Sequence, residues 1–267
     1  MKKTLAFVLM MSIAATAAET IKLNNAEIWP QTQEIKTRVT FTEDGLSVNE
    51  NGRLSFVSAK KFDVDLTKSY TISTTVKNLG GEDTMVYLGF SPIDAKGIPI
   101  ACAAVNHRAN SFTSLVKDAK KGDNFLILKD ASAWNTTSTT TAVALDAKED
   151  FSDMPNNFRL YPVTKIEKLE DGTWRVETRQ KLNRDLPAGT NVRQHNAGGY
   201  LYTGGAVKLK PGEERVMKGT IKGLDQPGSY NPRKWPVGTV KTQVVLLSNH
   251  SHKKCPMQFT NFKIDIE

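Results

Sequence analysis

The stretch YTISTTV at residues 70–76 alternates from one residue to the next and is rich in β-branched side chains. This period of two residues is typical of a β-strand with one buried face. Working outward, the apolar run 85–90 is followed by a turn sequence at 94–97 and by a second short run at 98–100. We therefore predict a strand over 70–76 and a hairpin after it.

The C-terminal part of the chain continues the strand pattern. The run from Gln243 to Leu247 is mostly apolar, as in a strand buried on both faces, and Phe262, Ile264 and Ile266 share one alternating face. We find no stretch with a sustained helical period and helix caps. The sequence therefore predicts an all-β protein.

The middle of the chain carries its own series of strands and turns. The sequence Glu170-Asp171-Gly172 is a hairpin turn signal between two strand-like runs. We predict that residues 19–111 and 198–267 are halves of one β-sandwich, and that residues 112–197 form a small inserted β-subdomain. The alternative is one continuous, irregular β-domain.

The first eighteen residues have the pattern of a cleavable signal peptide. Lys2 and Lys3 give a positive start, a short apolar run follows, and small residues precede Glu19. The run is shorter than the about 20 apolar residues that span a bilayer. We predict cleavage after Ala17 or Ala18 and a secreted or periplasmic protein. The alternative is an uncleaved anchor.

The formal net charge of +8 comes from lysines and arginines that are spread along the chain. Proteins that bind nucleic acid usually concentrate these residues on one face, so we expect no nucleic-acid partner. Dispersed positive charge is typical of solubility or of mild attraction to anionic surfaces and polymers. After residue 18 no segment is apolar enough to cross a membrane, so we expect no transmembrane segment.

Several segments resemble one known superfamily. They are 62–65, 68–73, 87–90, 93–97 and the closing strand 259–266. These segments, about half of the chain after the signal peptide, resemble the galactose-binding-like superfamily, especially bacterial carbohydrate-binding modules of families four, nine and twenty-two. The resemblance implies a jelly-roll β-sandwich and a polysaccharide or cell-surface glycan as partner. Members often have a structural calcium site near the last strand, and here Thr260-Asn261 stands in place of the paired acidic residues.

Aromatic residues in glycine- and proline-rich loops are the best candidates for sugar contacts. Sugar rings stack their apolar faces on aromatic rings, while their hydroxyl groups need polar side chains. The candidate ligand-binding residues are Tyr200, Tyr202, Tyr230, Asn231, Arg233 and Trp235. The alternative is that Trp235 closes the end of the sandwich as a core residue.

An acidic cluster offers a possible calcium site and no other cofactor is indicated. Its members are Asp146, Glu149, Asp150 and Asp153, and oxygen ligands in one loop suit calcium. The spacing lacks the pattern of an EF-hand, and a solvated turn is the alternative. His250 and His252 lack a third metal ligand in the sequence.

The two cysteines, Cys102 and Cys255, could form a disulfide in an exported protein or remain separate buried thiols. No nucleophile elbow, phosphate loop or dinucleotide motif occurs. We therefore expect a non-catalytic protein that binds glycans. A structural or assembly protein without a small ligand is the second hypothesis, and a glycan-active enzyme is the third.

Overall fold

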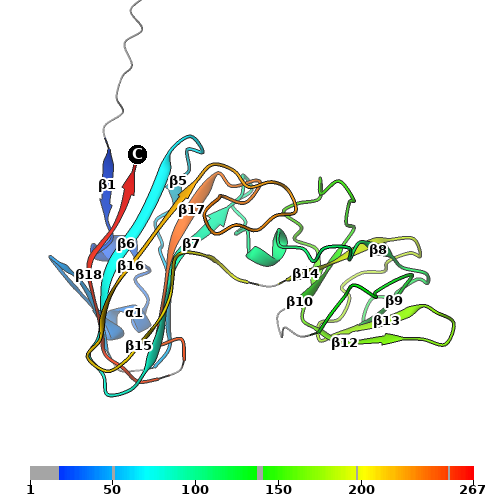
Figure 1. Ribbon diagram of the computed structural model, residues 1–267, viewed down its shortest axis with the longest axis horizontal. Coiled ribbons are helices and arrows are strands. Elements are labelled where there is room, and N and C mark those ends of the chain that lie inside the picture. The colour runs from blue at the N-terminus through cyan, green and yellow to red at the C-terminus, as the bar shows by residue number, and fades with distance from the viewer. Residues whose placement is uncertain (1–17, 50–51, 137–140, 197, 252) are drawn as a thin grey trace, which may run out of the picture.

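The computed structural model describes residues 18–49, 52–136, 141–196, 198–251 and 253–267, and these form a β-sandwich with a smaller β-unit at its side (Figure 1). The predicted all-β sandwich is confirmed. The predicted signal peptide lies outside the described residues except for Ala18. No helix among the described residues has the length and apolar character needed to cross a membrane.

The first sheet of the sandwich has six strands in the order β16-β6-β18-β3-β2, with β1 paired to β18. All its pairings are antiparallel. Its strands are β1 (Glu19–Lys22), β2 (Val39–Thr42), β3 (Gly45–Val48), β6 (Ser69–Asn78), β16 (Glu214–Lys222) and β18 (Met257–Ile266). Two short helices, η1 (Ala26–Ile28) and α1 (Gln33–Arg38), connect β1 to β2. The first and last strands of the chain are therefore neighbours.

The second sheet has the order β15-β7-β17-β4, with β5 paired to β17, and it is also antiparallel. Its strands are β4 (Leu54–Val57), β5 (Phe62–Asp63), β7 (Thr84–Ile93), β15 (Leu201–Leu209) and β17 (Lys241–Ser248). The predicted turn at 94–97 follows β7 directly. There the Asp94 amide donates to the carbonyl of Ile98 at 3.0 Å, and Gly97 has a φ of +80°, which glycine adopts without strain.

The sandwich core lies between the two sheets and follows the alternation seen in the sequence. In β6 every second residue is buried, Thr74 among them, and the apolar members of this face include Tyr70, Ile72 and Val76. They join one cluster with Leu88 and Phe90 of the second sheet. Removing apolar surface from water stabilises a fold by about 25 cal/mol per Å². This cluster is therefore the main stabilising contribution of the sandwich.

The inserted unit runs from Thr113 to Asn196 and contains two small antiparallel sheets. One has the order β11-β10-β14-β8 and the other β12-β13-β9. The strands are β8 (Thr113–Ser114), β9 (Phe125–Leu128), β10 (Thr141–Leu145), β11 (Arg159–Leu160), β12 (Val163–Lys168), β13 (Trp174–Thr178) and β14 (Asn191–Asn196). Among the described residues no strand of the sandwich pairs with a strand of this unit. The strands of the unit enclose a separate core of mostly aliphatic side chains, such as Leu126, Val143 and Val192.

The two connections between the units lie side by side. The amide of Asn196 donates to the carbonyl of Asn106 at 2.7 Å, and His107 and His195 form an antiparallel bridge. The helix η2 (Cys102–Ala104) lies on the outgoing connection, where Figure 1 shows it between the two units. A small apolar cluster fills the junction: Ile100, Ala104, Val105 and Met154, with Phe151 and Val237 against it.

Candidate functional site

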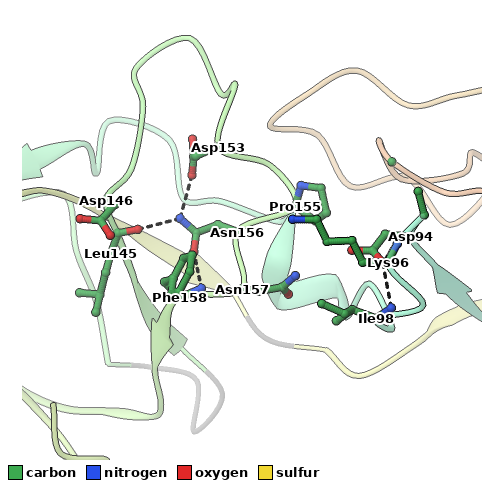
Figure 2. Close-up of a pocket in the computed structure, with 12 residues that line it drawn as sticks. Asp94, Lys96, Ile98, Leu145, Asp146, Asp153, Pro155, Asn156, Asn157 and Phe158 are labelled. Carbon is green, nitrogen blue, oxygen red and sulfur yellow. Dashed lines mark hydrogen bonds between the residues drawn. The ribbon is translucent and has the colours of Figure 1, made fainter. Parts of the chain in front are cut away.

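An open cleft lies where the sandwich meets the inserted unit (Figure 2). We call it the junction cleft, and its volume is about 520 Å³. The sandwich contributes the turn after β7 and Gly238, and the inserted unit contributes the loop between β10 and β11. The lining residues are Asp94, Ala95, Lys96, Ile98, Leu145, Asp146, Asp153, Pro155, Asn156, Asn157, Phe158 and Gly238.

The sandwich side of the junction cleft is a turn held by one carboxylate. Oδ1 of Asp94 accepts hydrogen bonds from the backbone amides of Lys96 at 2.9 Å and Ile98 at 2.8 Å. Lys96 is exposed and makes no ion pair with a described residue. Ile98 is also exposed, with 43% of its surface accessible. The turn therefore presents one cation and one apolar side chain to the cleft.

The opposite side is organised by the buried amide of Asn156. Its Nδ2 donates to the carbonyl of Leu145 at 2.8 Å and to Oδ2 of Asp153 at 2.9 Å, and its Oδ1 accepts from the amide of Phe158 at 2.9 Å (Figure 2). Both N–H groups of this amide donate and its oxygen accepts, so Asn156 fixes the backbone at Leu145 and at Phe158. It therefore holds Phe158 in place.

Phe158 is the most exposed aromatic side chain among the described residues, with 61% of its surface accessible. The guanidinium of Arg184 lies 5.2 Å from the centre of its ring and also pairs with Asp146. A cation over a ring face is favourable and steadies the ring. Phe158 therefore offers a positioned apolar surface beside polar groups.

A second cleft, of about 380 Å³, lies on the other side of Phe158. It shares Leu145, Asn157 and Phe158 with the junction cleft. Its other lining residues are Arg159, Leu160, Gln180, Lys181, Asn183 and Arg184. We call it the basic cleft because its charged lining residues are all cations. The two clefts are therefore neighbours that share the exposed phenyl ring.

The prediction that Trp235 offers a stacking face is wrong. Trp235 is 0% exposed, and its ring packs edge-on against Tyr70 at 5.5 Å and against Phe90 at 5.2 Å. Its amide donates to the carbonyl of Gly223, which draws the loop across the end of the sandwich. The side chain is a core residue, as in the alternative stated above.

The other predicted residues of that loop do not line the junction cleft. Oδ1 of Asn231 accepts from the amide of Arg233 at 2.9 Å, a local turn bond. Arg233 lies in a separate shallow cleft with Thr203 and Lys218. The Gly228 amide donates to the sulfur of Met154 at 3.0 Å, so the loop contacts the inserted unit, and a side chain at Gly228 would meet the ring of Phe151.

The predicted tyrosines gather near Cys102, away from the junction cleft. Tyr202 packs against Tyr87 at 4.8 Å and Tyr200 at 6.2 Å between ring centres, and Cys102 donates to the carbonyl of Tyr200. Burial raises the pKa of Tyr202 to about 12 and also raises that of Tyr230. These rings are half-buried and pack on one another, so they present less free surface than Phe158.

The predicted calcium site is contradicted by the partners of its carboxylates. Asp153 accepts from Arg193 at 2.8 Å, Asp146 pairs with Arg184, and Asp150 caps the amide of Ser152. No group of three potential ligands occurs among the described residues, and Glu149 joins no ion pair there. The aspartates of this cluster therefore cap turns and form ion pairs.

The carboxylate of Asp153 is largely enclosed by the protein, with 8% of its side chain exposed. Burial opposes its charge, but hydrogen bonds from Asn156, the Lys148 amide and Arg193 outweigh burial and lower its pKa. The carboxylate therefore remains charged at neutral pH, and its partners leave it unsuited to donate a proton.

The possible disulfide is also contradicted, because both cysteines are free and buried. Cys102 lies against Gly198 near the junction, whereas Cys255 lies against Gly80 and donates to the carbonyl of Glu82 at 3.2 Å. Each thiol has its own environment, and burial raises the pKa of Cys102 to about 11.

The sequence analysis missed Phe158 and the asparagine that holds it. The signal that could have found them is the segment Pro155-Asn156-Asn157-Phe158, in which a lone aromatic follows two turn-forming residues. No family model, curated protein or solved structure matches this chain. The resemblance to carbohydrate-binding modules therefore stays a prediction.

Proposed function

We propose that this protein binds a glycan without catalysis, and that the junction cleft is the binding site. The observation that carries the proposal is the exposed ring of Phe158 at the edge of an open cleft with polar walls. An exposed aromatic ring beside polar groups offers a surface on which the apolar face of a sugar can stack.

The chemistry of the cleft suits a sugar ring. The apolar C–H face of the ring would stack on Phe158, and the exposed Ile98 supports that apolar contact from the opposite wall. Asn157 and Lys96 are exposed polar groups for hydroxyls. Oδ2 of Asp94 receives no hydrogen bond from a described residue and is a further acceptor. The cleft is open, which suits a chain that extends beyond the bound residue.

The same walls argue for binding over hydrolysis. Glycoside hydrolysis uses a pair of carboxyl groups, one of which must donate a proton. Asp153 is held charged by three partners, and Asp146 is paired with Arg184. The two are therefore structural groups of the wall.

We further propose that the protein is exported, as the pattern of residues 1–18 predicts. N-terminal sequencing of the protein from its native cells is expected to begin at Ala18 or Glu19. An intact Met1 on exported protein would contradict cleavage.

A glycan screen followed by calorimetry tests the binding proposal. We expect affinities in the micromolar to millimolar range, because each sugar gains little after displacing water. Phe158→Ala is expected to weaken binding roughly tenfold, since it removes the stacking surface. Leu79→Ala is the matched control, because Leu79 is 51% exposed and lines neither cleft.

Two outcomes would overturn the proposal. One is a screen in which no glycan binds at millimolar concentration. The other is binding that Phe158→Ala leaves unchanged, which would move the site elsewhere on the molecule. Self-association that Phe158→Ala abolishes would instead favour the assembly hypothesis.

A further inference from the structure

We infer that the basic cleft binds the anionic group of an acidic glycan, a carboxylate or a sulfate ester, through Arg159 and Lys181. This inference rests on the proposed function, and it assigns the class of glycan.

The charges that line the basic cleft are all of one sign. Arg159, Lys181 and Arg184 line it, and no Asp or Glu occurs among the described residues that do. The amides of Gln180, Asn157 and Asn183 complete the polar wall. Oε1 of Gln180 accepts from the amide of Tyr161 at 2.9 Å, which leaves its NH₂ group as a donor. The cleft therefore offers donors and positive charge.

Arg159 is the arginine that carries the inference. It is half-buried, and its Nη1 is a buried atom that has no hydrogen-bond partner among the described residues. Burial lowers its pKa, and no neighbouring carboxylate offsets that cost. A desolvated cation without a counter-ion is unfavourable, and an anion in the basic cleft would lower that cost by charge attraction to the guanidinium, without contacting the buried Nη1 itself.

Other arginines of this chain show what Arg159 lacks. Arg193 pairs with Asp153 at 2.8 Å, Arg175 with Glu177 at 2.9 Å and Arg215 with Glu213 at 2.6 Å. Arg159 makes no ion pair with a described residue, although its place in β11 is fixed by pairing with Ala144. The planar guanidinium suits two-point recognition of a carboxylate or sulfate.

The position of the cleft connects this anion site to the sugar site. Phe158 and Asn157 line both clefts, and Arg159 is the next residue in the chain. A sugar that stacks on Phe158 therefore has neighbouring substituents beside the basic cleft. Arg184, which is paired with Asp146 and lies over Phe158, serves to position the ring.

Calorimetry with three matched oligosaccharides tests the inference. The probes are an oligogalacturonate, its fully methyl-esterified form, which lacks the charge, and a sulfated neutral oligosaccharide of similar length. We expect the wild-type protein to bind at least one of the charged probes about tenfold to a hundredfold more tightly than the ester, as charge-assisted hydrogen bonds predict. Which charged probe binds assigns the anion as carboxylate or sulfate.

Arg159→Gln and Lys181→Gln are expected to reduce binding of the charged probe and to leave binding of the ester unchanged. Arg179→Gln is the matched control, because Arg179 is exposed, lies close in sequence to Lys181 and lines neither cleft. Arg159→Gln is also expected to keep the thermal midpoint of the free protein, since it removes an uncompensated charge.

The outcomes separate this inference from the proposed function. Equal binding of charged and esterified probes, unaffected by Arg159→Gln, overturns the anion site and leaves glycan binding in place. Stabilisation of the wild-type protein, but not of Arg159→Gln, by inorganic sulfate with no glycan binding keeps an anion site and overturns the glycan. An equal loss of charged-probe binding in Arg179→Gln would reduce the effect to general electrostatic attraction and contradict the inference.

Discussion

Nε of Arg193 donates a hydrogen bond to Nε2 of His195 at 3.0 Å, inside the junction between the two β-units. Because Nε2 accepts this bond, the proton of the neutral ring is on Nδ1, which donates to the carbonyl of Ala103 at 2.7 Å. Arg193 also donates to the Lys148 carbonyl and to Asp153. One buried arginine and one neutral histidine thereby connect strand β14 to the helix η2 of the sandwich connection.

His195 makes the stability of the protein depend on pH. Burial, assisted by the charge of Arg193, lowers its pKa from 6.5 to about 3. Below pH 6.5 the unfolded chain binds a proton that the folded chain does not, so stability is complete above 6.5 and falls with decreasing pH. We expect a loss approaching 1.4 kcal/mol per unit between pH 6 and 4.

Urea unfolding at a series of pH values measures this slope. In His195→Gln the slope should become shallower, and the remaining slope includes His107, whose pKa burial also lowers. A wild-type slope that His195→Gln leaves unchanged would contradict the assignment of a neutral, buried ring.

The ion pair of Arg193 with Asp153 is buried, with 1% and 8% of the side chains exposed. Removing one partner leaves an unpaired buried charge, so Asp153→Asn and Arg193→Met are each expected to cost about 3–5 kcal/mol. The double variant should cost less than the sum, which a double-mutant cycle by urea unfolding measures. The exposed pair Lys165 with Glu167 is the control, and solvent screening should leave it little coupling. Additive losses at the buried pair would show that its members act independently.

Trp235→Ala is expected to destabilise the sandwich by about 3–5 kcal/mol, because it removes a fully buried ring between Tyr70 and Phe90. Chemical denaturation measures the loss, and Phe158→Ala should change stability by no more than about 0.5 kcal/mol. If the two variants were equally stable, Trp235 would not be the core residue described above.

Trp235 and Phe158 show which features of this protein the sequence predicts and which it does not. Strands such as 70–76 could be predicted because the alternation of side chains is local. The strands of the inserted unit lie within the predicted range 112–197, because their turn and strand signals are also local. Whether a loop aromatic points inward depends on partners far along the chain, and the sequence does not indicate which aromatic will find them.

The acidic cluster and the cysteines illustrate the same limit. Four carboxylates close in sequence predicted a shared ion, yet Asp146 and Asp153 pair with arginines 38 and 40 positions away. A loop sequence cannot indicate such distant counter-charges. Whether the two cysteines form a disulfide likewise depends on the distance between them, which the packing of the sheets sets.

Thiol titration of the denatured, unreduced protein is expected to return two thiols, because Cys102 and Cys255 are both free. In the folded protein both should react slowly with a thiol reagent at neutral pH, since both are buried and the pKa of Cys102 is raised to about 11. Recovery of no thiol from the denatured protein would establish a disulfide and contradict the structure.

The sandwich is expected to fold without the inserted unit. Asn106 and Asn196 are joined by a backbone hydrogen bond of 2.7 Å, so the two connections to the inserted unit already lie together. Replacing residues 107–195 with a short Gly/Ser linker should therefore add little closure entropy. We expect the shortened protein to unfold cooperatively, as circular dichroism during urea unfolding measures.

Some loss of stability should accompany this deletion, because Ile100, Ala104 and Val105 lose their packing against Met154. Met154→Ala in the full chain is the control that estimates this part of the loss. The same deletion removes Phe158 and the wall of the junction cleft that the inserted unit contributes, so binding of any glycan to this cleft should also be lost. A deletion variant without a cooperative transition would mean that the sandwich needs the inserted unit in order to fold.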